Sequence, residues 1–181
     1  MSQTFLDAIR RRRSQYALGP ELPLSRDETT ALIQEAVRLA PSSFNSQSSR
    51  AVILHGDESR RFWEIVREAL RGIVPAEAFA ATGQKIDSFA AGAGTVLFYE
   101  DQDVVKALQE QFPLYADNFP VWSEHSTGIA QFAVWTALAN AGIGASLQHY
   151  NPLPDEAAAK AWNLPASWKL RAQMPFGANA G

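Results

Sequence analysis

Apolar residues in the first part of the chain recur with the spacing of helices that bury one face. Thr4 is placed to cap a first helix, which runs into the basic stretch 10–13. Ser25 and Glu28 form the pattern of a capping box at the start of a second helix. The apolar positions of that second helix are Leu32, Ile33, Ala36, Val37 and Ala40. Pro41 predicts where the helix ends, because proline disfavours helical backbone in the residue before it.

Short apolar runs between the helical segments predict the strands of one sheet. The expected strands are 51–54, 95–99, 145–149 and 168–175. The expected further helices are 62–70, 75–89, 101–109, 126–141 and 155–162. Apolar and small residues surround most of helix 126–141, which predicts a buried central helix. The mixture, with helices in the majority, indicates an α+β fold in which helices pack on a sheet.

The length of 181 residues suits a single domain, 1–181, and no repeat or linker divides the chain. A net charge of −3 argues against a general nucleic-acid binder. The absence of cysteine excludes disulfides, thiolate metal sites and a cysteine nucleophile. The N-terminus lacks the apolar core of a secretory signal, and no apolar run approaches the roughly 20 residues of a membrane span. We therefore expect a cytoplasmic protein that binds neither nucleic acid nor membrane.

The segment 40–47 joins the second helix to the first expected strand and is rich in hydrogen-bonding side chains. Ser42, Ser43, Asn45 and Gln47 carry hydroxyl or amide groups that suit a flat ligand rich in heteroatoms. Loops on a rigid scaffold often hold binding residues. Serine, asparagine and proline are also ordinary turn residues. The local sequence therefore leaves a binding loop and a simple turn equally open.

Four consecutive arginines precede Ser14. Arg12, Arg13 and Ser14 together have the donors to hold a phosphate monoester. A solvated basic face, or arginines that favour a helix C-terminus, explains the same run and is the interpretation that the local sequence favours. Binding of nucleic acid or an anionic membrane is a third interpretation, which no other basic cluster supports.

Two further segments carry candidate binding residues. Four aromatic residues, Phe119 and Trp122 among them, lie between positions 112 and 122. They suit the wall of a pocket for a flat apolar substrate, although at least half of such rings normally fill the core. Further along, Gln148 and His149 stand at the end of an expected strand, where a single histidine is more often structural than catalytic.

The motifs of several enzyme classes are missing from the sequence. No Gly-x-Ser-x-Gly elbow, His-Glu-x-x-His zinc motif, Rossmann fingerprint or Walker A sequence occurs. The three histidines and the lack of cysteine offer no metal site by spacing. No residue therefore stands out as a catalytic acid, base or nucleophile.

Six segments taken in order do carry a recognisable pattern. They are Arg-Arg-Ser-Gln-Tyr at 12–16, Ala-Pro-Ser-Ser-Phe-Asn-Ser-Gln-Ser-Ser-Arg at 40–50, and the segments 91–98, 119–126, 144–152 and 168–177. Together they resemble the FMN-dependent nitroreductase family, and most of all its short branch of nitroreductase-like oxidoreductases from bacteria and fungi. The resemblance implies a nitroreductase-like α+β fold, with a central, mainly antiparallel sheet flanked by helices. It also implies a homodimer with two FMN molecules at the subunit interface.

The resemblance carries cofactor-binding roles to three groups of residues. The FMN phosphate falls to Arg12, Arg13 and Ser14. Contacts to the flavin from the partner subunit fall to Ser42, Ser43, Asn45 and Gln47. Contacts to the flavin ring fall to Lys85, Leu147, Gln148 and His149, the last through its backbone N–H toward flavin N5. Phe119 and Trp122 are expected to shape the substrate pocket.

The implied activity is that of an NAD(P)H-dependent FMN oxidoreductase, which reduces nitroaromatic or quinone-like acceptors by ping-pong hydride transfer through flavin N5. Two features depart from the family pattern. Tyr16 stands where many relatives have a second basic residue, and relatives usually continue well past the Pro-Phe-Gly at 175–177. The second departure keeps an alternative open, a flavin-binding regulatory or sensor module with little turnover.

Overall fold

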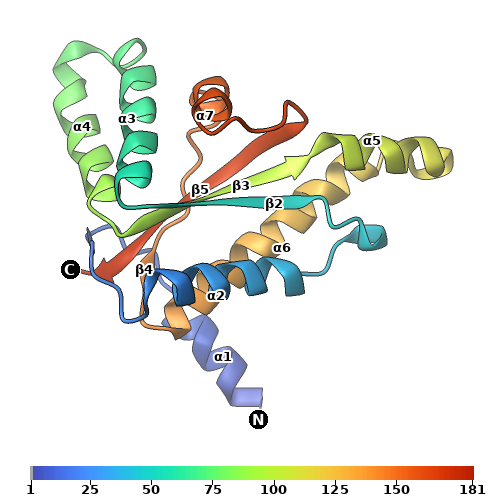
Figure 1. Ribbon diagram of the computed structural model, residues 1–181, viewed down its shortest axis with the longest axis horizontal. Coiled ribbons are helices and arrows are strands. Elements are labelled where there is room, and N and C mark those ends of the chain that lie inside the picture. The colour runs from blue at the N-terminus through green and yellow to red at the C-terminus, as the bar shows by residue number, and fades with distance from the viewer. Residues whose placement is uncertain (1) are drawn as a thin grey trace.

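The computed structural model describes residues 2–181, in which a five-stranded sheet lies between two layers of helices (Figure 1). The strands are β1 (Leu18–Gly19), β2 (Ser49–His55), β3 (Gly94–Asp101), β4 (Gly144–Ala145) and β5 (Trp168–Asn179). Their order is β1-β5-β3-β2, and β4 also pairs with β5. All of these strand pairs are antiparallel, which confirms the expected α+β fold with a mainly antiparallel sheet.

The helices divide between the two faces of the sheet. They are α1 (Ser2–Arg11), α2 (Arg26–Leu39), α3 (Asp57–Arg71), α4 (Ala76–Ala90), α5 (Gln102–Gln111), α6 (Phe119–Asn140) and α7 (Asp155–Ala161), with short 3-10 helices at Ser43–Asn45 and Pro113–Tyr115. One face packs against α2 and α6, and the other packs against α3, α4 and α7 (Figure 1). None of the helices in the described part of the chain is long and apolar enough to cross a membrane.

Strand β3 lies at the centre of the core and is buried along almost its whole length. Its side chains alternate between the two faces, as the pleat requires. Val96 and Phe98 join the core on the α2 and α6 side. Leu97 and Tyr99 join the core on the α3, α4 and α7 side. Burial on both faces explains why this segment reads as a continuous apolar run in the sequence.

The start of α2 confirms the predicted capping box. The Glu28 N–H donates to Ser25 Oγ at 3.2 Å, and the Ser25 N–H donates to Glu28 Oε2 at 2.8 Å. Ile33, one turn further along, is fully buried in the core. These contacts fix α2 on the sheet, so the loop that follows Leu39 starts from a rigid support.

The first and sixth helices differ from the sequence predictions. Thr4 lies inside α1, which begins two residues earlier. Helix α6 begins at Phe119 and not near position 126, because Pro120 occupies the first turn, where proline is compatible with a helix. The expectation of a buried central helix is wrong for one face, since Ile129 and Phe132 are 42% and 40% exposed. Small and apolar residues on α6 therefore face solvent as well as the core.

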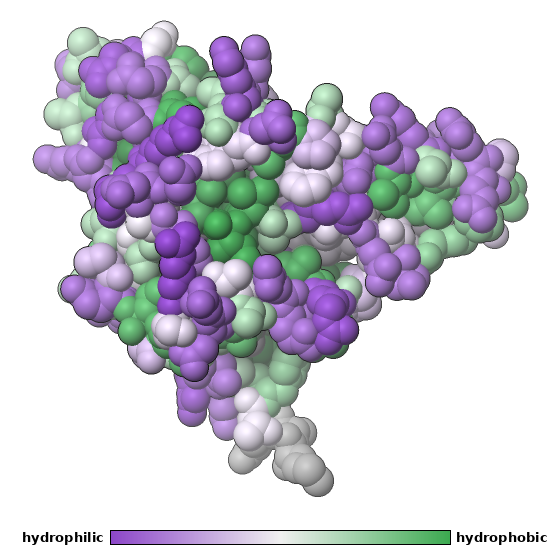
Figure 2. Space-filling view, viewed as in Figure 1, coloured by the Kyte–Doolittle hydropathy of each residue, from purple (hydrophilic) through white to green (hydrophobic). Residues whose placement is uncertain are grey.

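The strands also differ in extent. The expected strand 145–149 is regular only at β4, and the chain then continues as irregular backbone joined to β5 by a bridge between Gln148 and Gln173. Strand β5 extends four residues further than expected. Strand β1 was not predicted, because two residues are too short to show a periodic pattern. Strand β2 forms an edge of the sheet with half-buried apolar residues 51–53. Figure 2 shows apolar side chains gathered over this part of the sheet, with polar side chains covering the flanking helices.

Candidate functional site

The expected binding residues form two groups in the structure. The arginine group comprises Arg12, Arg13, Ser14, Lys85, Leu147, Gln148 and His149. The loop group comprises Ser42, Ser43, Asn45 and Gln47. The structure brings most members of each group together, with Lys85 linked to the arginine group only through Phe89 and Tyr16, and within one chain it keeps the two groups apart.

The segment after α1 is held beside β4. Ser14 forms a parallel bridge with Ala145, and the Gln15 N–H donates to the Ala145 carbonyl oxygen at 2.9 Å. Arg13 and Gln15 line a cavity of about 160 Å³ together with the turn at 142–144. At Gly144 a Cβ atom would meet the side chains of Gln15 and Leu18 at 3.3 Å, so the chain after α1 packs tightly against this residue. The backbone thus fixes the place of Arg12, Arg13 and Ser14.

Arg12 is the most distinctive residue of the arginine group. Its guanidinium lies over the ring of Trp135, with 4.3 Å between the guanidinium carbon and the ring centroid. Its Nε atom is buried and has no hydrogen-bond partner within residues 2–181. Buried donors are nearly always paired in folded proteins, and an unpaired one calls for a specific explanation. A charged donor held over an aromatic ring fits an anion such as a phosphate group.

The 145–149 segment lies along β5 beside this cation. The backbone N–H of Gln148 donates to the Gln173 carbonyl oxygen at 2.7 Å, and the return bond is 2.9 Å. The Gln148 side chain is buried and donates to Ser146 Oγ at 3.1 Å. His149 is exposed, and its backbone N–H makes no hydrogen bond within the described chain. That free N–H fits the predicted role of His149 better than its ring does.

Lys85 approaches the arginine group from α4. Its Nζ atom lies 6.0 Å from the ring centroid of Phe89, and the Phe89 ring lies 6.5 Å from that of Tyr16. Tyr16 follows the Arg12–Ser14 segment directly and is about half exposed. Lys85 is exposed as well. The arginine group is therefore built from three parts of the chain that lie far apart in sequence.

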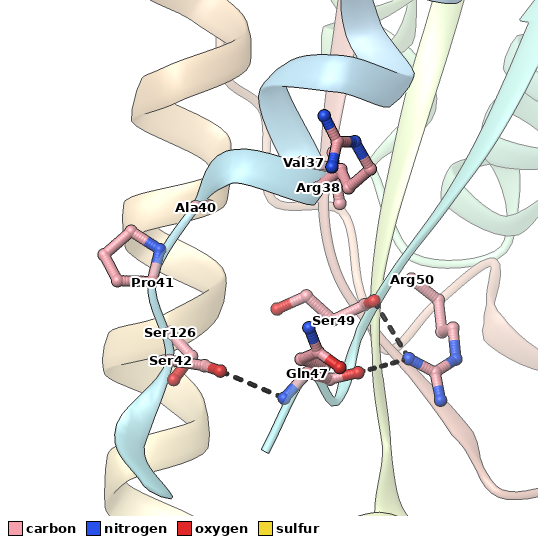
Figure 3. A pocket seen from close by; sticks show the side chains of 9 residues that line it. All are labelled: Val37, Arg38, Ala40, Pro41, Ser42, Gln47, Ser49, Arg50 and Ser126. Atoms are coloured by element: carbon pink, nitrogen blue, oxygen red, sulfur yellow. Dashed lines mark hydrogen bonds between the residues drawn. The ribbon is translucent and has the colours of Figure 1, made fainter. Parts of the chain in front are cut away.

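The loop group follows the C-terminus of α2. The Gln47 N–H donates to Ser42 Oγ at 3.0 Å, and the Asn45 N–H donates to the Ser42 carbonyl oxygen at 3.0 Å. Figure 3 shows Ser42 and Gln47 at the edge of a cavity of about 400 Å³, together with Arg38, Arg50 and Ser126. Arg50 donates to the Gln47 carbonyl oxygen at 2.6 Å and pairs with Asp101 at 3.0 Å. The loop is therefore closed by bonds of its own and tied to the sheet.

A buried carboxyl group supports the start of β2 behind the loop. Glu100 is fully buried and accepts hydrogen bonds from Ser48 Oγ, at 2.5 Å, and from Ser49 Oγ. Burial raises the pKa of Glu100, and the two serine hydrogen bonds lower it in part. No sequence pattern indicated that Glu100 is buried, because a single glutamate at the end of an apolar strand reads as exposed.

The two aromatic residues expected to shape a substrate pocket lie beside the loop group. Phe119 is 3% exposed, and Trp122 is half-buried. The Phe44 ring stacks on Trp122 with centroids 5.7 Å apart, and Phe119 meets Phe44 edge-on at 5.2 Å. Their role at a substrate pocket stays a prediction.

Strand β2 separates the two groups. The loop leads into Ser49, at one end of β2, whereas His55, at the other end, pairs with Gly94. Gly94 also pairs with Phe176, which pairs in turn with Ala145 of the arginine group. A strand of seven residues spans roughly 20 Å. The two groups thus lie at opposite ends of β2.

An apolar surface formed by α1, α2 and α6 is called the apolar patch below. Its exposed large side chains are Phe5, Leu39, Ile129 and Phe132, from α1, α2 and α6. They surround a shallow groove of about 440 Å³ with small residues of the same three helices. Gly128 lies on the exposed side of α6, and a Cβ atom placed there would meet nothing within 4 Å. Exposed apolar surfaces of this kind mark contacts with other molecules.

The sequence pattern missed Trp135, which reads as one more apolar residue of α6. Its indole N–H donates to the Ala145 carbonyl oxygen at 3.2 Å, so the ring is held in place to support Arg12. No local pattern links positions 12 and 135. Only the packing of α1 on α6 brings them together.

The structure thus combines an antiparallel α+β sheet with a cluster of arginines at one end of β2 and a polar loop at the other. The model of the Nitroreductase family matches residues 9–178, and the chain belongs to this family.

Nitroreductase FRM2 of Saccharomyces cerevisiae is 37% identical over 175 residues, which cover 96% of this chain and 86% of that protein. The solved nitroreductase CinD of Lactococcus lactis, in complex with 4-nitrophenol, is 53% identical with a TM-score of 0.89, and covers 98% of this chain and 90% of its own. Another structure of CinD contains chloramphenicol. A nitroreductase from Desulfitobacterium hafniense with bound FMN shares the fold, with a TM-score of 0.73 at 18% identity over 98% of this chain and 89% of its own.

Proposed function

We propose that this protein is an FMN-dependent oxidoreductase that uses NAD(P)H to reduce nitroaromatic or quinone-like acceptors. The observation that carries the proposal is the buried, unpaired Nε of Arg12, held against Trp135 beside Arg13 and Ser14. Two relatives support it. CinD has been solved with 4-nitrophenol, and a more distant family member has been solved with FMN.

The residues of the arginine group fit FMN in their chemistry. Arg12 and Arg13 supply guanidinium donors, and Ser14 supplies a hydroxyl donor for a phosphate monoester with about −1.5 to −2 charges. Lys85 adds positive charge toward the ring, where it would stabilise negative charge on the reduced cofactor. The free N–H of His149 supplies a donor for flavin N5. Bound FMN would supply the redox chemistry, hydride transfer from NAD(P)H and then to the acceptor, which explains the lack of a catalytic acid or base.

We further propose that the active form is a homodimer in which each FMN lies between the arginine group of one subunit and the loop group of its partner. Strand β2, roughly 20 Å long, separates the two groups of a single chain, and we therefore place each cofactor between two chains. The apolar patch would lie between those chains. A twofold axis through that patch would place the arginine group of each subunit opposite the loop group of its partner.

Gly128 supports the use of the patch by a second copy. Glycine in the interior of a helix costs about 0.8–1.0 kcal/mol relative to alanine. Nothing in the described chain lies close enough to require it, because a Cβ atom would have open space. A partner helix packed closely against α6 provides the missing reason.

The test of the cofactor and the activity is spectroscopic. Purified protein, or protein reconstituted with FMN, should be yellow and should bleach under anaerobic conditions on addition of NADH or NADPH. Its colour should return on addition of 4-nitrophenol or a quinone. A protein that stays colourless after reconstitution would contradict the proposal. Bound flavin that neither nicotinamide reduces would contradict the activity and leave a flavin-binding module.

A further inference from the structure

The loop that carries the loop group has an unusual backbone. Phe44, Asn45 and Gln47 have φ angles of 55°, 48° and 50°, in the left-handed region. Asparagine tolerates this region, whereas phenylalanine and glutamine rarely adopt it. Such residues persist where the surrounding structure holds them, and they are concentrated at functional sites. The hydrogen bonds within the loop hold part of this conformation, and contacts from outside the loop add to them.

The ring of Phe44 provides a contact of that kind. It lies within 6 Å, between ring centroids, of four other aromatic rings. These are Phe112 at 5.1 Å, Phe119 at 5.2 Å, Trp122 at 5.7 Å and Tyr115 at 5.9 Å. The four rings come from the end of α5, the 3-10 helix Pro113–Tyr115 and the first turn of α6. Offset and edge-on ring pairs at these distances attract one another beyond the burial of their surface.

The partners of Phe44 are themselves firmly placed. Phe119 is almost fully buried, and it also meets Trp122 edge-on at 5.3 Å. Phe44 itself remains 49% exposed, so its ring contacts the cluster from the surface. Truncation of Phe44 would therefore remove the ring contacts without opening a cavity inside the core. The contacts of the Phe44 ring with the four aromatic rings, called the clamp below, can therefore be removed by substitution at Phe44 while the fold is retained.

We propose that Phe44 is a positioning residue of the flavin site. Its ring, held by the aromatic cluster, keeps the loop in the left-handed conformation that presents Ser42, Asn45 and Gln47 to the cofactor. The contact with FMN rests on the proposed function, whereas the clamp itself is a property of the chain. The cluster also gives Phe119 and Trp122 a use that their burial fits, since they support the loop through Phe44.

The test compares Phe44→Ala with Phe44→Tyr, and with Leu114→Ala as the matched control. Leu114 lies on the neighbouring 3-10 helix and is 85% exposed, so its truncation leaves the ring contacts intact. Phe44→Ala should weaken FMN binding about tenfold, as expected from the loss of several ring contacts. Phe44→Tyr and Leu114→Ala should bind FMN like the wild-type protein. A purely structural role would instead lower the stability of Phe44→Ala and leave the FMN affinity of the folded protein unchanged.

Amide hydrogen exchange of residues 42–48 in the cofactor-free protein tests the clamp separately. Faster exchange in Phe44→Ala, with the wild-type rate in Phe44→Tyr, would support the clamp. This holds even if the wild-type protein binds no FMN, since that result would contradict only the proposed function. Equal exchange in the wild-type protein and Phe44→Ala would overturn the inference. Equal FMN affinity of the two proteins, where the wild-type protein does bind FMN, would overturn it as well.

Discussion

Substitution of Gly128 by alanine has opposite expected effects for a free and for a covered α6. In the isolated chain the added methyl group meets nothing within 4 Å. Replacing a helical glycine should then stabilise the fold by about 0.8–1.0 kcal/mol. For a chain of this size the midpoint of thermal unfolding would rise by about 2–4 °C.

If a partner helix packs against Gly128, the same substitution should destabilise the dimer instead of stabilising the chain. Extra methylenes in a well-packed contact typically cost about 1–3 kcal/mol. Because a twofold interface would bring both copies of the substitution together, we expect the dimer dissociation constant to rise about tenfold or more. Gly128→Ala should therefore be a more stable monomer and a weaker dimer, and should lose FMN on dilution sooner than the wild-type protein.

Sedimentation equilibrium gives the dimer dissociation constant, and thermal unfolding at low concentration gives the stability of the monomer. Glu110→Ala, an exposed substitution on α5 away from the apolar patch, serves as the control and should leave dimerisation unchanged. A Gly128→Ala protein that is more stable and dimerises as tightly as the wild-type protein would refute the placement of the partner on α6.

Two further substitutions test the polar groups. Arg12→Met removes a buried donor without a partner, so the cofactor-free protein should keep or gain stability in chemical denaturation. Its FMN affinity, measured by flavin fluorescence, should fall about 10- to 100-fold through the loss of a charge-assisted bond; unchanged affinity would rule Arg12 out as a phosphate ligand. Glu100→Gln tests the buried carboxyl, whose folded-state pKa is raised by burial. The stability that Glu100 contributes is present below its ordinary pKa and is lost as pH rises through the folded-state pKa. The free energy of unfolding of the wild-type protein should therefore fall relative to Glu100→Gln as pH rises above the ordinary pKa of a glutamate, and parallel curves in urea titrations would contradict the burial argument.

Much of the fold was predictable because local signals agreed with packing. The capping box of α2 and the apolar run of β3 both appear in the structure as expected. The start of α6 was not predictable from apolar spacing, since aromatic and proline residues at its first turn read as a loop. The shortening of the strand after Gly144 depends on its pairing with β5, which no local pattern contains.

The binding residues could be proposed from the sequence, but not their arrangement. The hydrogen-bonding residues of the loop group were visible as a polar cluster after a helix. Their distance from Arg12 follows from the antiparallel pairing of β2 with β3, and pairing partners are not encoded locally. The support that Trp135 gives to Arg12, and that Phe112 gives to Phe44, arises from the packing of helices far apart in sequence. The strained backbone at Phe44 runs against local propensity and is therefore visible only in three dimensions.

The shared site is tested most directly by mixing two defective proteins. One carries Arg12→Met and Arg13→Met, and the other carries Ser42→Ala and Asn45→Ala. Each alone should bind little FMN. When the two are co-expressed in equal amounts, half of the dimers should be mixed, and each mixed dimer has one site built only from intact halves. About a quarter of all sites should therefore bind FMN and reduce 4-nitrophenol with NAD(P)H. If each chain builds a complete site by itself, the mixture will recover no FMN binding above that of the two parents, and that result would contradict a flavin site shared between subunits.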